Sequence, residues 1–252
     1  MSFAVPADAY DRFMGRYSQR LAPLLADFAG VRRGQHALDV GCGPGALTAE
    51  LVARLGADAV AAVDPSEPFV AAARERYPDV DIRRAAAEEL PFSDSEFDVV
   101  LACLVVHFMA DPVAGLREMA RVARAGSVVA TCVWDHAGDR GPLSVYWTAV
   151  RQLDSEVADE SRLAGARKGH LGELFAAAGL AAAEEGDLAV SVEYASFDEW
   201  WEPYLLGVGP SGAYVAGLNP ARRDELRETC RRLLPEPPFT VEAHAWAARG
   251  DA

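Results

Sequence analysis

An apolar run that breaks abruptly into closely spaced glycines, LDVGCGPG from Leu38 onward, constrains this chain more than any other feature. The three glycines are Gly41, Gly43 and Gly45. Glycine adopts backbone angles that other residues rarely reach, and it lets a ligand approach the main chain closely. The run before the glycines is typical of a buried strand, and the stretch after them is compatible with a helix. A strand, a glycine turn and a helix N-terminus together favour a site for a nucleotide-like ligand.

Strand-like and helix-like runs alternate through the first half of the chain. Strands are expected at 37–41, 59–63, 80–84, 97–104 and 127–134. Helices are expected between them at 46–55, 67–76 and 112–124. Such alternation predicts an α/β fold with a doubly wound, mostly parallel sheet and right-handed crossovers.

The regular alternation stops after Trp134. Two further strands are expected at 187–195 and 239–247, where apolar residues alternate, and a helix is expected at 170–178. We therefore expect one domain over residues 1–252 with attached segments. These segments are lid helices at 7–29 and a small helical cap from insertions at 135–169 and 196–237.

Composition excludes several classes of function. The formal net charge of −14 disfavours a nucleic-acid partner, because an acidic surface repels phosphates. No stretch of 18 apolar residues occurs, and the start MSFAVPADAYDRF does not resemble a secretory signal. The four cysteines show no CxxC spacing, which favours a reduced, cytoplasmic protein without a disulfide framework. We expect no metal site, since the loop with Asp135, His136 and Asp139 is a common type of acidic turn.

The glycine pattern alone fits two cofactors, a dinucleotide or another nucleoside-containing ligand. Asp39 lies where a dinucleotide site usually has an apolar residue, and its carboxylate suits an ammonium group better than a pyrophosphate. Asp64 ends the second strand, where a carboxylate can accept hydrogen bonds from two ribose hydroxyls. Each aspartate also has a structural interpretation: Asp39 as the cap of a turn, and Asp64 as the N-cap of a helix near Pro65. A third segment, AAAEELPF at 85–92, brings Glu88 to the same edge of the sheet.

Taken together, LDVGCGPG, VDPSE and AAAEELPFSDSEFDVVLACLVVHF resemble the class I S-adenosylmethionine-dependent methyltransferases. The closest likeness is to the small-molecule branch that includes the ubiquinone and menaquinone methyltransferases. The resemblance covers residues 10–134, and the two later strands fit the closing hairpin of that fold. It implies a Rossmann-like, seven-stranded sheet, mostly parallel with an antiparallel last strand.

The resemblance also implies a set of contacts to S-adenosylmethionine and its product S-adenosylhomocysteine. The implied cofactor residues are Arg16, Tyr17, Asp39, Gly41, Cys42, Gly43, Gly45, Asp64, Pro65, Ser66, Ala87, Glu88, Cys103 and Leu104. The chain departs from the family at Ala86, where an aspartate is common. Adenine recognition would then depend on the Ala87 main chain and on Glu88.

Methyl transfer from a sulfonium is a displacement in which the protein aligns the reactants and excludes water. His107, just after the fourth strand, is a candidate base, although a structural histidine is the simpler interpretation. Phe13 and Met14 are candidates to close the lid. The aromatic residues of the cap either wall an acceptor pocket or only pack in the core. They are Tyr146, Trp147, Trp200, Trp201 and Tyr204.

The sequence thus predicts transfer of a methyl group to an oxygen, nitrogen or carbon atom of a small, partly aromatic or apolar molecule. One alternative is a nicotinamide-dependent oxidoreductase of similar architecture. The other is a cofactor-binding regulatory or scaffold protein without activity. A monomer and a homodimer are both compatible with the sequence.

Overall fold

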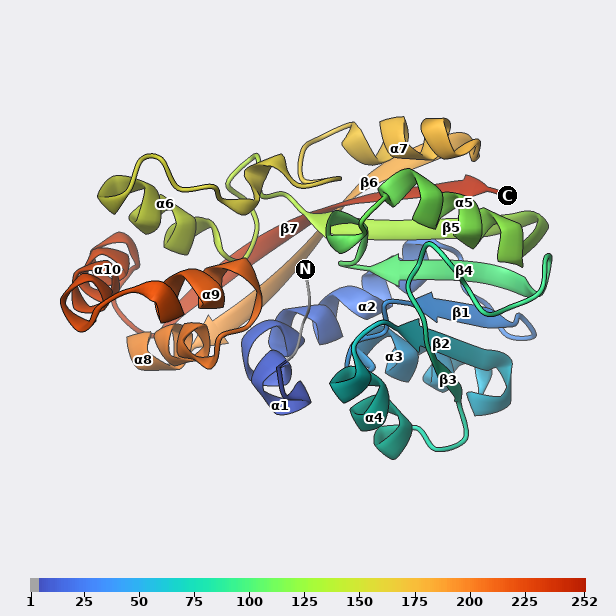
Figure 1. Ribbon diagram of the computed structural model, residues 1–252, viewed down its shortest axis with the longest axis horizontal. Coiled ribbons are helices and arrows are strands. Elements are labelled where there is room, and N and C mark those ends of the chain that lie inside the picture. The colour runs from blue at the N-terminus through green and yellow to red at the C-terminus, as the bar shows by residue number, and fades with distance from the viewer. Residues whose placement is uncertain (1–4) are drawn as a thin grey trace.

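A seven-stranded sheet runs through the part of the chain that the computed structural model describes, residues 5–252 (Figure 1). The first four residues of the segment MSFAVPADAYDRF lie outside the described residues. The strands are β1 (Ala37–Val40), β2 (Val60–Asp64), β3 (Asp81–Arg84), β4 (Phe97–Cys103), β5 (Ala123–Trp134), β6 (Ala181–Tyr194) and β7 (Phe239–Asp251). Their order across the sheet is β3-β2-β1-β4-β5-β7-β6.

Strand direction confirms the predicted fold class. Neighbouring strands from β3 to β5 pair in parallel, whereas β7 runs antiparallel to both β5 and β6. The strands expected at 127–134 and 187–195 are longer than predicted, since they begin at Ala123 and Ala181. The order reverses between β1 and β4, and ligands of open α/β sheets bind at such a switch point.

Helices cover both faces of the sheet, because its central strands are apolar on both sides. Along β2, Val60 and Ala62 pack in one hydrophobic cluster, whereas Ala61 and Val63 pack in another. The first cluster includes α2 (Arg16–Phe28), α3 (Ala46–Leu55) and α4 (Glu67–Arg76), together with helices of the cap. The second includes α5 (Pro112–Val122) and α7 (His170–Ala178). Short helical turns connect these elements: α1 (Ala7–Tyr10), η1 (Asp11–Gly15), η2 (Ala57–Ala59), η3 (Val106–Phe108) and η4 (Glu160–Arg162).

The cap lies at one end of the molecule, where β6 and β7 extend beyond the other strands (Figure 1). It consists of α6 (Ser144–Leu153), α8 (Phe197–Trp201), η5 (Glu202–Leu206), α9 (Gly209–Gly217) and α10 (Pro220–Leu233). The cap contacts the start of the predicted lid segment. The ring of Phe13, in η1, and the ring of Tyr204, in η5, lie 5.1 Å apart, edge to face.

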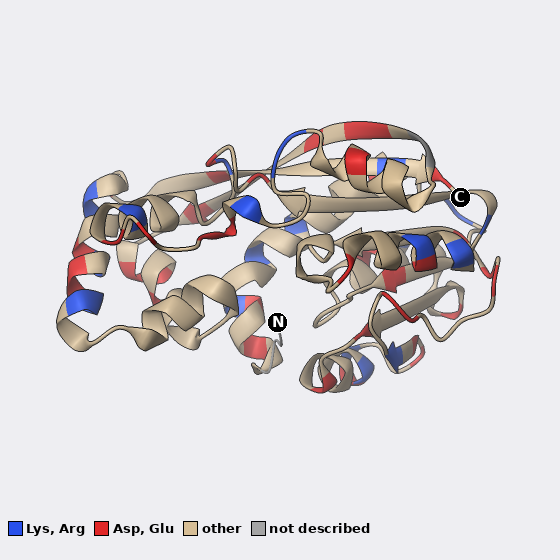
Figure 2. Ribbon diagram, turned by 45° about the horizontal axis from the view of Figure 1, so that its top comes forward, with Lys and Arg blue, Asp and Glu red and all other residues tan. Residues whose placement is uncertain are grey.

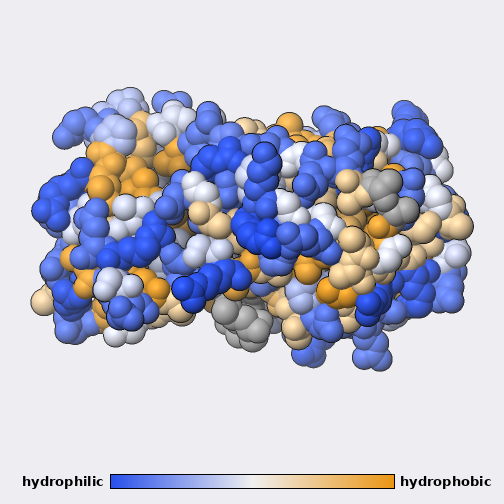
Figure 3. Space-filling model, turned by 90° about the horizontal axis from the view of Figure 1, so that it is seen from above, coloured by the Kyte–Doolittle hydropathy of each residue, from blue (hydrophilic) through white to orange (hydrophobic). Residues whose placement is uncertain are grey.

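Charged residues of both signs are spread over the molecule (Figure 2). Basic residues are interspersed with acidic ones in Figure 2, without a continuous basic stripe in that view. Viewed from above, hydrophilic residues cover most of the molecule, and apolar ones gather at the end that holds α6 and α10 (Figure 3). In the described part of the chain, no helix combines the length and apolarity needed to cross a membrane.

Candidate active site

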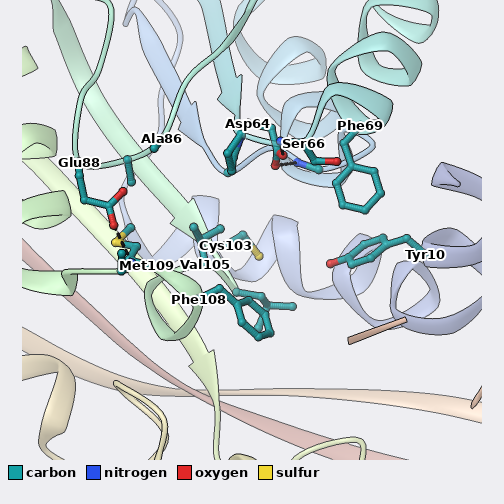
Figure 4. A pocket seen from close by; sticks show the side chains of 16 residues that line it. Tyr10, Asp64, Ser66, Phe69, Ala86, Glu88, Cys103, Val105, Phe108 and Met109 are labelled. Carbon is teal, nitrogen blue, oxygen red and sulfur yellow. Dashed lines mark hydrogen bonds between the residues drawn. The ribbon is translucent and has the colours of Figure 1, made fainter. Parts of the chain in front are cut away.

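The carboxyl ends of four parallel strands surround a cavity of about 320 Å³ (Figure 4). The glycine turn follows β1, Asp64 ends β2, residues 85–88 follow β3, and Cys103 ends β4. The lining residues are Tyr10, Gly41, Gly43, Asp64, Pro65, Ser66, Phe69, Ala86, Ala87, Glu88, Cys103, Leu104, Val105, Phe108, Met109 and Ala110. The volume falls at the lower end of the range that small-molecule sites occupy.

The glycine turn is open toward the cavity and tightly packed behind it. Gly41 and Gly43 have φ angles of 73° and 54°, in the left-handed region that favours glycine. A Cβ at Gly41 would lie 2.4 Å from Cγ2 of Val105, whereas a Cβ at Gly43 would meet nothing within 4 Å. The main chain at Gly43 therefore faces free space that a ligand can occupy. Cys42 and Gly45 complete the turn without lining the cavity.

Asp64 connects the glycine turn to the following helix. Its Oδ2 accepts a hydrogen bond from Gly43 N at 2.9 Å, and its Oδ1 accepts one from Ser66 N at 2.8 Å. Burial raises the pKa of this carboxyl, and the two backbone hydrogen bonds oppose that shift. Each carboxylate oxygen can accept a second hydrogen bond, so the fixed carboxylate can also receive hydroxyl donors from the cavity. Its structural role and its predicted ligand role are compatible.

Asp39 lies behind the turn, outside the lining of the cavity. The side chain is buried, and its Oδ2 accepts a hydrogen bond from Thr48 Oγ1 at 2.7 Å. Its Oδ1 has no hydrogen-bond partner. Burial raises the pKa of Asp39 to about 7, since the charged form is poorly solvated. A buried carboxylate oxygen without a partner is costly, and a nearby cationic group would stabilise it.

The segment after β3 supplies the opposite wall. Glu88 Oε1 accepts hydrogen bonds from Ala110 N at 2.7 Å and from Asp111 N at 3.2 Å, so Glu88 fixes the loop after β4 (Figure 4). Ala86 and Ala87 line the cavity beside it. Ala86 stands where the methyltransferases that the sequence resembles often have an aspartate, so Glu88 is the acidic residue on this wall.

The loop after β4 separates this cavity from a second, smaller one. The second cavity, of about 40 Å³, shares Tyr10, Leu104 and Phe108 with the first. Leu104 has a φ of 62°, which is strained for a branched side chain and is held by a hydrogen bond from its N to Cys132 O at 3.0 Å. Strain of this kind concentrates at functional sites. The other lining residues are Phe13, Met14, His107, Trp134, His136, Leu143, Glu160, Val208, Gly209, Pro210 and Ser211.

His107 lines the second cavity and is buried. Its Nδ1 has no hydrogen-bond partner. Burial lowers the pKa of His107 well below its usual value, with a smaller contribution from His136. The imidazole is therefore neutral at physiological pH, and a ring nitrogen can serve as a hydrogen-bond or proton acceptor.

Arg16 and Tyr17 lie away from both cavities. Arg16 Nη2 donates a hydrogen bond to Glu199 Oε1 at 2.7 Å, and its guanidinium lies 4.6 Å from the centre of the Tyr194 ring. The hydroxyls of Tyr17 and Tyr194 are 2.8 Å apart. In this structure the two residues fasten the lid helix α2 to β6 and to the cap, where the sequence interpretation placed them at the cofactor.

The five cap aromatics do not line either cavity and pack behind the second one. The rings of Tyr146 and Tyr204 stack with centroids 4.5 Å apart, and the Tyr146 hydroxyl donates to Ser211 O at 2.9 Å. Trp147 Nε1 donates to Glu160 Oε2 at 2.9 Å. Trp200 and Trp201 are both buried, although adjacent positions on a helix point in different directions. These rings contact residues on the wall of the second cavity and pack in the core behind it.

Several lining residues were not predicted from the sequence. Tyr10 is one helical turn before Phe13 and Met14, and Phe108 follows His107, so their positions next to candidates were the available signal. Glu160 lies in η4 and Ser211 in α9 of the cap, and neither is next to a candidate residue in the sequence.

Comparisons with known proteins agree with this geometry. A family model described as a methyltransferase domain matches residues 38–131. The phosphatidylethanolamine N-methyltransferase of Cereibacter sphaeroides is 32% identical over 162 residues, which cover 62% of this chain and 77% of that protein. The chain belongs to the class I S-adenosylmethionine-dependent methyltransferases. The family resemblance is thereby confirmed, the cofactor is S-adenosylmethionine, and the nicotinamide alternative is set aside.

Other relatives match only part of their own length or share only the fold. The ubiquinone/menaquinone biosynthesis C-methyltransferase of Idiomarina loihiensis is 36% identical over 110 residues, 41% of this chain and 44% of that protein. The chain thus spans less than half the length of the curated relatives it matches first. A solved geranyl diphosphate C-methyltransferase from Streptomyces coelicolor A3(2) has a TM-score of 0.56 at 15% identity, covering 94% of this chain and 80% of that one, and shows the shared fold.

The larger cavity of the methyltransferase fits its cofactor. Gly43 leaves main chain accessible and Asp64 offers a fixed carboxylate for hydroxyl groups, while Asp39, behind the turn and outside the lining, has a buried oxygen that lacks a partner. A nucleoside bearing an ammonium group matches this set of donors and acceptors.

Proposed function

We propose that this methyltransferase transfers the methyl group of S-adenosylmethionine to an oxygen, nitrogen or carbon atom of a small molecule whose reacting end enters the second cavity, which has a volume of about 40 Å³. One observation carries the proposal: the two cavities share a wall of Tyr10, Leu104 and Phe108. A cofactor in the larger cavity and an acceptor in the smaller one would thus lie side by side.

Different residues around the larger cavity would bind different parts of the cofactor. The glycine turn would hold the methionine part, with Asp39 near its amino group. Asp64 would accept hydrogen bonds from the ribose hydroxyls, while Pro65, Ser66, Ala87 and Glu88 would border the adenine. Cys103 ends β4, Leu104 follows it on the shared wall, and both would flank the sulfur.

The protein would contribute alignment, exclusion of water and a proton acceptor. When bound, the cofactor supplies an activated methyl group. Phe13 and Met14 of the lid and Val208 of the cap enclose the second cavity, which would keep water from the reacting atoms. His107 is neutral because it is buried, so its ring would accept a hydrogen bond from the acceptor; as a weak base it would take the proton when methylation makes that proton acidic.

We further propose that residues 7–29 act as a lid and that 135–169 and 196–237 act as a cap of one domain. The four free cysteines, with Sγ atoms of Cys103 and Cys132 3.7 Å apart, support work in a reducing compartment such as the cytoplasm. The net charge of −14 supports a small molecule over a nucleic acid as the acceptor.

Calorimetry with S-adenosylhomocysteine and with NADH, followed by a turnover assay, tests the proposal. We expect S-adenosylhomocysteine to bind and NADH not to bind. We also expect release of S-adenosylhomocysteine from S-adenosylmethionine with at least one member of a panel of phenols, amines and quinols. Cofactor binding without turnover across the panel would favour the regulatory alternative.

The titration of Asp39 makes cofactor binding depend on pH. Burial raises its pKa to about 7, so the carboxyl becomes ionised as the pH passes from 6 to 8. A ligand ammonium prefers the ionised form, and binding should therefore tighten with rising pH, by up to about tenfold per unit below the pKa, and then level off. Calorimetry with S-adenosylhomocysteine at several pH values measures this. In Asp39→Asn, the affinity for S-adenosylhomocysteine should no longer depend on pH. An unchanged pH dependence in that variant would show that another group causes it.

A further inference from the structure

The second cavity concentrates buried polar atoms that lack partners. Among the described residues, eight buried side-chain nitrogen or oxygen atoms have no hydrogen-bond partner. Four of them belong to residues that line this cavity: His107 Nδ1, Trp134 Nε1, His136 Nε2 and Ser211 Oγ. All four residues are more than nine-tenths buried. Because buried polar groups in native proteins are nearly always paired, these four atoms need polar partners inside the cavity, and the polar end of a ligand can supply them.

The chemical roles of these atoms restrict the ligand. Trp134 Nε1 is a donor only, so the ligand must offer an acceptor such as a hydroxyl oxygen. Glu160 lies on the same wall, is 4% exposed, and its Oε2 already accepts a hydrogen bond from Trp147 Nε1. Its carboxylate can accept a further hydrogen bond, so the ligand should also offer a donor. The imidazoles of His107 and His136 and the hydroxyl of Ser211 can pair with either a donor or an acceptor of the ligand.

Charge restricts the ligand further. Acidic Asp64, Glu88 and Glu160 line the two cavities, and no lysine or arginine is among the lining residues of either. A phosphate or carboxylate would therefore meet carboxylates in a buried setting, without a compensating cation. Aromatic rings of Tyr10, Phe13 and Trp134 on the walls of the second cavity suit an apolar body or a cation.

We propose that the second cavity, whose volume of about 40 Å³ admits only the reacting end of an acceptor, selects hydroxyl or amine ends that carry no negative charge, and that Glu160 determines this specificity by excluding anionic ends. The inference rests on the proposed function and adds the class of acceptor to it. The proton that such a group loses on methylation can pass to Glu160 or to His107, both on the wall. Burial raises the pKa of Glu160 to about 7, so above that pH the side chain is ionised and can both repel an anionic end and take up this proton.

Four probes of similar size and different polarity test the inference: benzylamine, benzyl alcohol, benzoate and toluene. Their affinities are measured by ligand-observed NMR on the protein saturated with S-adenosylhomocysteine. We expect benzylamine and benzyl alcohol to bind at least about tenfold more tightly than benzoate or toluene. Glu160→Gln keeps the acceptor for Trp147 and removes the charge, so it should weaken benzylamine by about tenfold and leave benzyl alcohol within about threefold.

A matched control is Glu156→Gln, an exposed carboxylate in the same cap segment, which should change no affinity. Ser211→Ala, which removes one unpartnered hydroxyl without adding volume, should weaken benzyl alcohol and leave toluene unchanged. The inference is overturned if benzoate binds as well as benzylamine, if Glu160→Gln changes nothing, or if no probe binds. Binding of S-adenosylhomocysteine is measured in the same samples, so loss of cofactor binding, which contradicts the proposed function, is distinguished from loss of probe selectivity.

Discussion

Replacing Asp64 by alanine is expected to weaken the binding of S-adenosylhomocysteine by about 1–3 kcal/mol, a rise in Kd of about fivefold to 150-fold. The carboxylate is the group that we propose for the ribose hydroxyls, and a hydrophobic methyl cannot replace it. The substitution also leaves Gly43 N and Ser66 N without their acceptor, at distances of 2.9 and 2.8 Å in the native protein. Calorimetry measures the change.

The control for this variant is Asp58→Ala, which removes an exposed aspartate just before β2 and should leave the Kd unchanged. Asp64→Asn keeps one acceptor oxygen and should fall between the wild type and the alanine variant. A Kd for Asp64→Ala equal to that of the wild type would contradict the placement of the cofactor beside β2.

Replacing Gly41 by alanine is expected to lower the free energy of unfolding by about 2–5 kcal/mol, through two separate effects. The φ of 73° is unfavourable for any residue with a Cβ, and that Cβ would lie 2.4 Å from Cγ2 of Val105. Denaturant unfolding measures the sum. The same substitution should reduce cofactor affinity, because Val105 lines the larger cavity and must move.

Two further variants separate these effects. Gly30 has a similar φ of 71° but open space around the Cβ position, so Gly30→Ala should report the backbone effect alone. In a Val105→Ala background, Gly41→Ala should be less destabilising by about 1–3 kcal/mol, since the obstructing methyls are gone. Equal losses for Gly41→Ala and Gly30→Ala would show that the close contact with Val105 has no energetic effect.

The sheet and the larger cavity could be predicted from the sequence because their signals are local. The glycine turn, Asp64 and Glu88 each lie at a strand end, and parallel strands bring such ends to one edge of the sheet. Alternating strands and helices then specify the order of the elements without knowledge of the cap.

The second cavity could not be predicted in the same way, because its residues meet only through tertiary packing. Glu160 belongs to η4 and Ser211 to α9, two short elements of the cap that lie far apart in the sequence. Arg16 was assigned to the cofactor, but its partner Glu199 is 183 positions away in the sequence. Aromatic composition likewise could not show that Trp200 and Trp201 would both be buried.

A structure determined with S-adenosylhomocysteine bound is the most direct test of the division between cofactor and acceptor cavities. We predict that the nucleoside occupies the larger cavity, with its ribose at Asp64 and its sulfur at the wall formed by Tyr10, Leu104 and Phe108. The second cavity, between His107 and Glu160, should stay free of the cofactor. A cofactor that fills the second cavity, or that binds without contact to Asp64, would contradict the account.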